Sequence, residues 1–127
     1  MVRFVSTRDK NGPSCSVSEA LLKGLAPDGG LYVPSTMPQR PSDFTLKEGV
    51  SYAMYQAIKP FFEGDELEGD LLQICEDACN FPVPMKNLGG NKVLLELIYG
   101  PTSAFKDFGA RFLAFSMEKL LERRGEE

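Results

Sequence analysis

The sequence predicts an α/β protein, with an α+β arrangement inside these 127 residues, and three observations support this prediction. Apolar residues recur at helical spacing in the middle of the chain and near its end. Short β-rich stretches lie near the start of the chain and at residues 93–98. The last of these stretches is followed by a turn and a helix, which together make half of the βαβ unit found in parallel sheets.

The first third of the chain is predicted to form a strand, a helix and a second strand. Residues 3–7 (RFVST) are β-rich and precede turn residues. Ser16 and Glu19 have the spacing of a capping box, which predicts that a helix starts there and stops at Gly24. Residues 31–33 (LYV) are expected to form the second strand.

Two further helices are predicted in the middle of the chain. Thr45 and Glu48 have capping-box spacing, and Pro60 should disturb the last turn of the helix that they begin. The apolar positions of that helix are Leu46, Val50, Met54, Ala57, Ile58 and Phe61. The next helix is expected over residues 67–79 because its apolar residues recur at i, i+4 and i+8.

The end of the chain is predicted to hold a buried strand at residues 93–98 and a helix at residues 105–123. Phe108, Phe112, Phe115 and Leu120 should share one face of this helix. Two arginines near its end complement the helix dipole. A single buried strand has no partner in a parallel sheet, so we expect the sheet to continue beyond Glu127.

Composition and charge exclude several classes of protein. With 43% hydrophobic and 25% charged residues, the chain is typical of soluble globular proteins. A net charge of −4 argues against a nucleic-acid partner, because phosphate binding needs a dense basic face. The N-terminus lacks the apolar segment of a signal peptide, and no apolar run is long enough to span a membrane. The chain has three cysteines, and an odd number agrees with a reducing compartment, where structural disulfides are rare. Together these features favour the cytoplasm.

Metal chemistry is not predicted. Cys75 and Cys79 lie four residues apart on a predicted helix and would share a face, as two metal ligands could. A metal site needs three or four ligands and the chain has no histidine, so we interpret both cysteines as core residues. The acidic run EGDELEGD at residues 63–70 lacks the ligand spacing of a calcium loop and is interpreted as a solvated helix start.

Lys106 is the first candidate for chemistry, because it stands between two phenylalanines where a turn becomes a helix. A helix N-terminus and apolar neighbours both favour a neutral amine that can attack a carbonyl. The adjacent carboxylate of Asp107 opposes this, since it favours the cation. Local chemistry alone leaves two interpretations, a reactive lysine and an ordinary solvated lysine.

The segment ELIYGPTSAFKDFGARF, residues 96–112, resembles the threonine synthase family. The pyridoxal phosphate lysine of that family lies in a segment of the form HGPT-x-AFKDFG-x-RF. Four other stretches resemble the N-terminal domain of the family in the same order. They are STR at 6–8, EALLKGLAPDGGLYVP at 19–34, FEGDEL at 62–67 and NFPVPMKNL at 80–88.

The resemblance implies two domains and one activity. Residues 1–80 would form the N-terminal threonine synthase domain, and residues 81–127 would begin a fold-type-II pyridoxal phosphate-dependent catalytic domain. The full-length protein would be a lyase of threonine biosynthesis that converts O-phospho-L-homoserine and water into L-threonine and phosphate. Lys106 would be both the cofactor-binding and the catalytic residue, acting as general base and acid. The isolated chain would be inactive, because the family's loop for the cofactor phosphate comes later.

The sequence also departs from the family pattern and leaves alternatives open. Tyr99 stands where the family has a histidine, and tyrosine does not titrate near neutral pH. The related alternative is a phospho-lyase that eliminates phosphate and releases a keto acid. The unrelated alternative is a non-catalytic binding or assembly domain in which Lys106 is solvated. Arg8 is a candidate phosphate contact or a plain surface arginine. The sequence does not give the oligomeric state.

Overall fold

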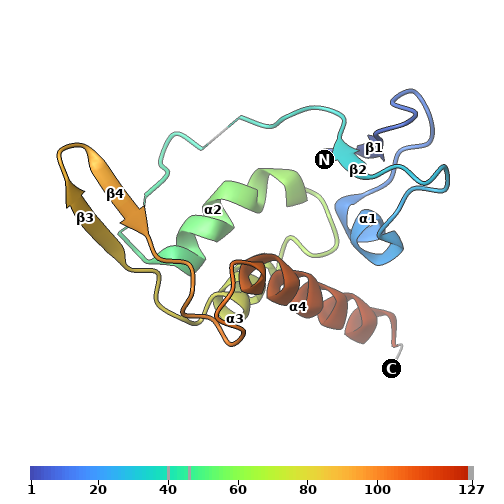
Figure 1. Ribbon diagram of the computed structural model, residues 1–127. Coiled ribbons are helices and arrows are strands. Elements are labelled where there is room, and N and C mark those ends of the chain that lie inside the picture. The colour runs from blue at the N-terminus through green and yellow to red at the C-terminus, as the bar shows by residue number, and fades with distance from the viewer. Residues whose placement is uncertain (40, 46, 126–127) are drawn as a thin grey trace.

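The computed structural model describes residues 1–39, 41–45 and 47–125, and the α+β arrangement predicted from the sequence is confirmed within them (Figure 1). The helices that form the core stand in the middle, with a small sheet and a short helix on one side and a hairpin on the other. The elements in chain order are β1 (Phe4–Ser6), α1 (Val17–Lys23), β2 (Tyr32–Pro34), α2 (Val50–Phe62), α3 (Leu71–Ala78), β3 (Met85–Gly89), β4 (Lys92–Leu95) and α4 (Lys106–Arg124).

The predicted strand, helix and strand at the start of the chain are confirmed. Strand β1 pairs antiparallel with β2. Helix α1 begins after a complete capping box, in which the Glu19 N–H donates to Ser16 Oγ at 3.1 Å and the Ser16 N–H donates to Glu19 Oε2 at 2.9 Å. The helix ends at Gly24, whose φ of 69° suits a residue without a Cβ. Local sequence signals determine this region.

Helix α2 begins later than predicted, and the capping box at Thr45 and Glu48 is wrong. The Thr45 N–H instead donates to Gln56 Oε1 at 3.0 Å, and Gln56 Nε2 donates to the Thr45 carbonyl at 2.8 Å. These two bonds hold residue 45 outside the helix, and Gly49 has a φ of 93° that a helix cannot include. The predicted apolar position Leu46 lies outside the described residues.

The acidic run before α3 is largely exposed, as predicted for a solvated helix start, but one of its carboxylates is buried and α3 begins four residues later than predicted. The chain turns instead around Asp65, whose side chain is buried. Its carboxylate accepts from the Ser18 N–H at 3.2 Å, from the Ser18 hydroxyl and from the Leu67 N–H at 3.0 Å. The bonds to Ser18 fasten the turn to the first residues of α1, where backbone donors lack partners inside the helix.

We expect Asp65→Ala to lower the free energy of unfolding by about 1–3 kcal/mol, because it leaves the buried Ser18 donors unsatisfied. Urea denaturation would measure the loss. Glu66→Ala is the control, since its partly exposed pair with Arg124 should contribute roughly 0–1 kcal/mol. Equal losses in the two variants would contradict a special role for Asp65.

The hydrophobic core lies between α2, α3 and α4, with a contribution from α1. Its fully buried members are Leu67, Leu71, Ile74, Cys75 and Leu120, each at most 1% exposed. On α4, Leu120 is therefore part of the same core as α3 and the turn before it, and Phe112 and Phe115 pack against this core. In the described ranges, no helix combines the length and hydropathy that a bilayer crossing requires.

The strand predicted as buried at residues 93–98 is exposed and shorter. Strand β4 ends at Leu95 and pairs antiparallel with β3 in a hairpin that extends away from the helices (Figure 1). Val93, Leu94 and Leu95 are 60%, 45% and 49% exposed. An apolar run indicates a strand but does not reveal its partner. Here β3 supplies an antiparallel partner, and the apolar side chains of β4 stay about half exposed or more.

Candidate functional site

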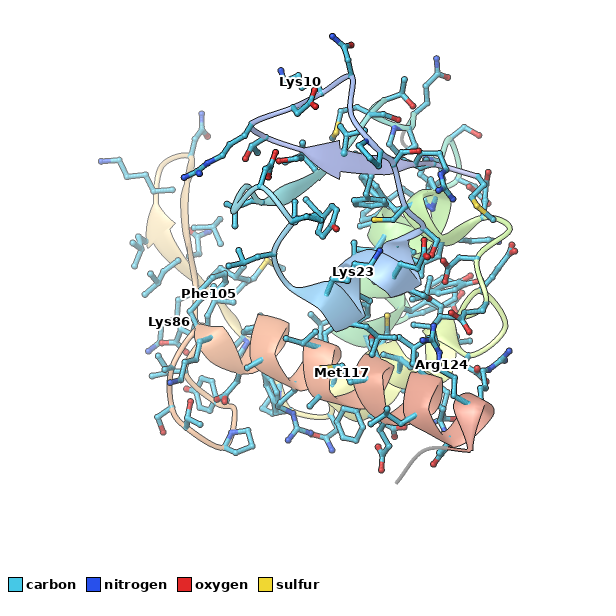
Figure 2. All side chains as sticks on the ribbon, turned by 90° about the vertical axis from the view of Figure 1, so that its right-hand side faces the viewer. Lys10, Lys23, Lys86, Phe105, Met117 and Arg124 are labelled. Carbon is cyan, nitrogen blue, oxygen red and sulfur yellow. The ribbon has the colours of Figure 1, made fainter. Side chains whose placement is uncertain are left out.

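Lys106 lies at the start of a helix, as predicted; it is the first residue of α4, and its side chain is exposed. No described residue forms an ion pair or hydrogen bond with its ammonium group. Phe105 before it is 69% exposed, so the apolar shielding expected from the sequence is not present among these residues. Figure 2 shows Phe105 at one end of α4, with Met117 and Arg124 farther along. Lys106 thus stands free at the N-terminal end of the longest helix of the described chain.

Asp107 holds the turn that leads to Lys106. Its side chain is 3% exposed, and it accepts from the Thr102 N–H at 2.9 Å and from Thr102 Oγ1 at 2.8 Å. Gly100 leaves room for this carboxylate, because a Cβ there would lie 2.8 Å from the Asp107 Cβ and Cγ. Ser103 adopts a φ of 54°, which is uncommon for a residue other than glycine. The carboxylate therefore fixes the turn rather than pairing with the neighbouring lysine.

The charge of Asp107 is favoured in the folded protein. Burial raises the pKa of this carboxyl, but the hydrogen bonds from Thr102 and Ala104 lower it more, so the net pKa lies below its ordinary value. The folded state therefore prefers the ionised carboxylate more strongly than the unfolded chain does. Its contribution to stability is complete above the unfolded pKa and is lost as pH falls through the folded pKa.

This predicts a pH-dependent difference between the wild type and Asp107→Asn. The asparagine resembles the protonated aspartic acid, because each lacks one of the two carboxylate acceptors. The wild type should have the higher Tm from neutral pH down to about pH 5, and the difference should shrink below about pH 4. Thermal unfolding across this range would test it. A difference that does not change with pH would contradict the assignment.

Arg111 joins α4 to the end of α3. Its Nε donates to the Ala78 carbonyl at 2.8 Å, and its Nη2 donates to the Asp77 carbonyl at 2.7 Å and to Asn80 Oδ1 at 3.1 Å. The last carbonyls of a helix lack partners within it and carry partial negative charge. The guanidinium of Arg111 donates hydrogen bonds to these carbonyls, and its positive charge complements their partial negative charge. The sequence analysis did not identify this contact, because the residues involved lie more than thirty positions apart.

The two arginines at the end of α4 have partners besides the helix dipole. Arg123 pairs with Asp70 through Nη2 at 2.6 Å, and Arg124 pairs with Glu66 at 3.0 Å. Both carboxylates come from the acidic run, and all four side chains are partly exposed. These pairs and the buried Leu120 attach the C-terminal half of α4 to the rest of the chain.

The structure places Tyr99 and Arg8 in unrelated local contacts. The Tyr99 hydroxyl donates to Glu96 Oε2 at 3.1 Å, and Lys86 forms an ion pair with Glu96 Oε1 at 3.0 Å. The Lys86 ammonium and the Tyr99 hydroxyl lower the pKa of the Glu96 carboxyl. Arg8 Nη1 donates to the Asp28 carbonyl at 3.0 Å. Among the described residues, no hydrogen bond joins either side chain to Lys106.

Cys75 and Cys79 are core residues, as predicted, at 0% and 5% exposure. Burial raises the pKa of the Cys75 thiol to about 12, and burial also raises that of Cys79. Cys79 Sγ lies 3.4 Å from Met54 Sδ on α2. Both thiols therefore stay protonated and pack as small apolar groups. Within the described ranges, no three His, Cys, Asp or Glu residues form a group that could hold a metal ion.

Comparison with known proteins gives consistent matches. A family model described as "Threonine synthase N terminus" matches residues 3–79. The threonine synthase of Pseudomonas aeruginosa is 36% identical over 98% of this chain, and that of Corynebacterium glutamicum is 35% identical over 97%. The chain spans 28% of the length of each relative.

Solved structures agree with these matches. The pyridoxal phosphate-bound threonine synthase from Brucella melitensis superimposes with a TM-score of 0.87 at 34% identity, covering 100% of this chain and 29% of that one. The yeast threonine synthase gives a TM-score of 0.75 at 28% identity, covering 96% of this chain and 27% of that one. On the family match to residues 3–79 and these relatives, the chain belongs to the threonine synthase family.

Proposed function

We propose that Lys106 is the cofactor-binding and catalytic lysine of a pyridoxal phosphate-dependent threonine synthase. The whole protein would convert O-phospho-L-homoserine and water into L-threonine and phosphate. The observation that carries the proposal is the state of Lys106, which is exposed and lacks a partner among the described residues. Its segment resembles the family's cofactor-lysine segment, and a related solved structure contains pyridoxal phosphate.

The residues at this position fit that cofactor. A lysine that forms a covalent link to an aldehyde must be reachable and must not be held in an ion pair. Asp107 is directed into the turn and accepts from Thr102, so it leaves the neighbouring ammonium unpaired. When bound, pyridoxal phosphate supplies an electron sink for a carbanion at the substrate α-carbon. Lys106 Nζ would hold the cofactor and later remove and return protons, while Asp107 and Thr102 keep its helix start in place.

The domain division predicted at residue 80 is also part of this proposal. Residues 1–80 would be the N-terminal domain, and residues 81–127 would begin the catalytic domain. The family match to residues 3–79 supports a boundary there. Helix α4 packs against α3 across this boundary, so the N-terminal domain would serve as a platform for the helix that carries Lys106.

We further propose that these 127 residues alone do not catalyse the reaction, since they span little more than a quarter of the relatives' length. Mixed with pyridoxal phosphate, they should give no stable cofactor absorption and no phosphate release from O-phospho-L-homoserine. Robust turnover by this chain would contradict the proposal. The cytoplasmic location expected from the sequence remains a prediction.

Product analysis of the longest natural form of the protein tests the proposed function. With O-phospho-L-homoserine, threonine and phosphate should appear in equal amounts. A related phospho-lyase would release 2-oxobutyrate in place of threonine, and that product would overturn the proposed reaction while keeping the cofactor. The mouse protein named Threonine synthase-like 1 is 33% identical over 87% of this chain, so both products should be measured. Release of neither product would favour a non-catalytic role.

A further inference from the structure

The geometry points to Arg111 as the positioning residue that sets where Lys106 stands relative to the first 80 residues. The inference rests on the proposed function of Lys106 and adds a residue to it. Arg111 would not touch substrate or cofactor. It would act by fixing the N-terminal half of α4 against the end of α3, both in position along the helix axis and in rotation about that axis.

The bonds of Arg111 are suited to this role. They form a fork on two carbonyls in the last turn of α3 and reach a third acceptor, Asn80 Oδ1. A planar guanidinium with fixed donor directions restrains both distance and rotation, which the single ammonium of a lysine does not. Two of these acceptors are carbonyls of α3, and the third belongs to a residue just after its end. The guanidinium is therefore held by groups that are as rigid as α3 itself.

Aromatic side chains restrain the same guanidinium. The Arg111 Cζ lies 5.5 Å from the centre of the Phe115 ring and 6.0 Å from that of Phe81. Phe81 in turn meets Phe108 edge to face, with ring centres 5.2 Å apart. Arg111 and Phe108 come from α4 and Phe81 from the segment after α3, so the cluster locks the two segments together. Cation–π contacts of this kind add to the hydrogen bonds.

Distance along the helix distinguishes Arg111 from the other anchors of α4. At about 1.5 Å per residue, Arg111 lies about 7.5 Å along the axis from Lys106, whereas Arg123 lies about 25 Å away. Figure 2 shows Phe105 and Arg124, the neighbours of Lys106 and Arg123 in the sequence, near opposite ends of α4. Loss of a distant anchor leaves the start of the helix fixed by Arg111. Loss of Arg111 removes the hydrogen bonds that tie the N-terminal half of α4 to the end of α3, and it leaves the ring contacts of Phe108 and Phe112 and the turn held by Asp107.

The test compares Arg111→Ala with Arg123→Ala in the longest natural form of the protein. Both variants remove an arginine that joins α4 to the α3 region. Arg111→Ala should lower kcat about 10²-fold with a smaller change in KM, as expected when a catalytic group is displaced by about 1 Å. Arg123→Ala should leave kcat close to wild type. Arg111→Lys should be intermediate, because it restores the charge without the fork.

Two readouts do not depend on turnover. In protein without cofactor, amide exchange of residues 106–110 should be faster in Arg111→Ala than in Arg123→Ala. Borohydride reduction after addition of pyridoxal phosphate should label Lys106 more slowly in Arg111→Ala than in wild type. Equal kcat and equal exchange in the two alanine variants would overturn the role of Arg111 while leaving the proposed function intact.

Two further outcomes are decisive. If Arg111→Ala does not fold, the matched pair Arg111→Lys and Arg123→Lys replaces it, and equal kcat in that pair overturns the role. If borohydride leaves no label on Lys106 in wild type, the proposed function fails, and the positioning role fails with it. If borohydride labels Lys106 in the wild type but the arginine variants do not differ from one another, only the positioning role of Arg111 fails and the proposed function stands.

Discussion

If the proposed function holds, replacement of Lys106 by alanine is expected to remove the cofactor absorption of the longest natural form of the protein and to lower its turnover by at least about 10²–10⁴-fold. This range is the typical contribution of one positioned acid–base group, and the lost covalent link to the cofactor adds to it. The fold should be unaffected, because the side chain is exposed and has no partner among the described residues. Absorption spectra, phosphate release and circular dichroism measure the three quantities.

The matched control is Lys119→Ala on the same helix. Lys119 forms a partly exposed ion pair with Glu122, so its removal should change stability by roughly 0–1 kcal/mol and leave turnover unchanged. Unchanged cofactor absorption and activity in Lys106→Ala would rule out the assigned lysine. The same loss in both variants would instead indicate a general effect on α4.

The elements that the sequence predicted well are those determined by neighbouring residues. The capping box of Ser16 and Glu19 satisfies backbone groups within three positions, so spacing alone identifies the start of α1. The bounds of α4 follow equally from its apolar spacing and from the turn residues before it. The position of Lys106 at the helix start was therefore predictable from the sequence.

The errors arise where distant residues decide the outcome. Thr45 has a local capping pattern, but Gln56 takes its backbone bonds and keeps it outside α2. The acidic run was expected to be solvated, yet Ser18, 47 residues earlier, draws Asp65 into the interior. For residues 93–98, the strand was identified but its partner and exposure were not. Periodicity records which residues are apolar and not what covers them.

The candidate site shows the same division between local and distant determinants. The resemblance identified Lys106, and its position on the helix agrees with the structure. For Asp107, the sequence indicated only a carboxylate next to the lysine that favours its charged form, and it did not indicate that this carboxylate accepts from Thr102. The spacing of Thr102 and Asp107 around a Gly-Pro turn could have suggested that bond. Nothing in the sequence indicated that Arg111 would reach the end of α3.

Leu120→Ala is expected to lower the free energy of unfolding by about 2–5 kcal/mol, the usual range for a buried leucine truncated to alanine. Leu120 is 0% exposed and belongs to the core that α3 and the turn before it also build. Leu113, on the same helix, is 38% exposed, so Leu113→Ala should cost less than about 1.5 kcal/mol. Urea denaturation of both variants measures the difference.

Urea denaturation of Leu120→Ala also decides whether α4 unfolds together with the first 80 residues. If the helix is part of one cooperative unit, Leu120→Ala should shift the whole transition to lower urea without changing its slope. If α4 is only docked on the surface, the loss should be small and the slope should fall, because the helix would leave before the rest unfolds. The first result would mean that the platform and the helix carrying Lys106 are stabilised by the same buried contacts. The second would leave the position of Lys106 dependent on Arg111, on the ring contacts of Phe108 and Phe112, and on the surface ion pairs.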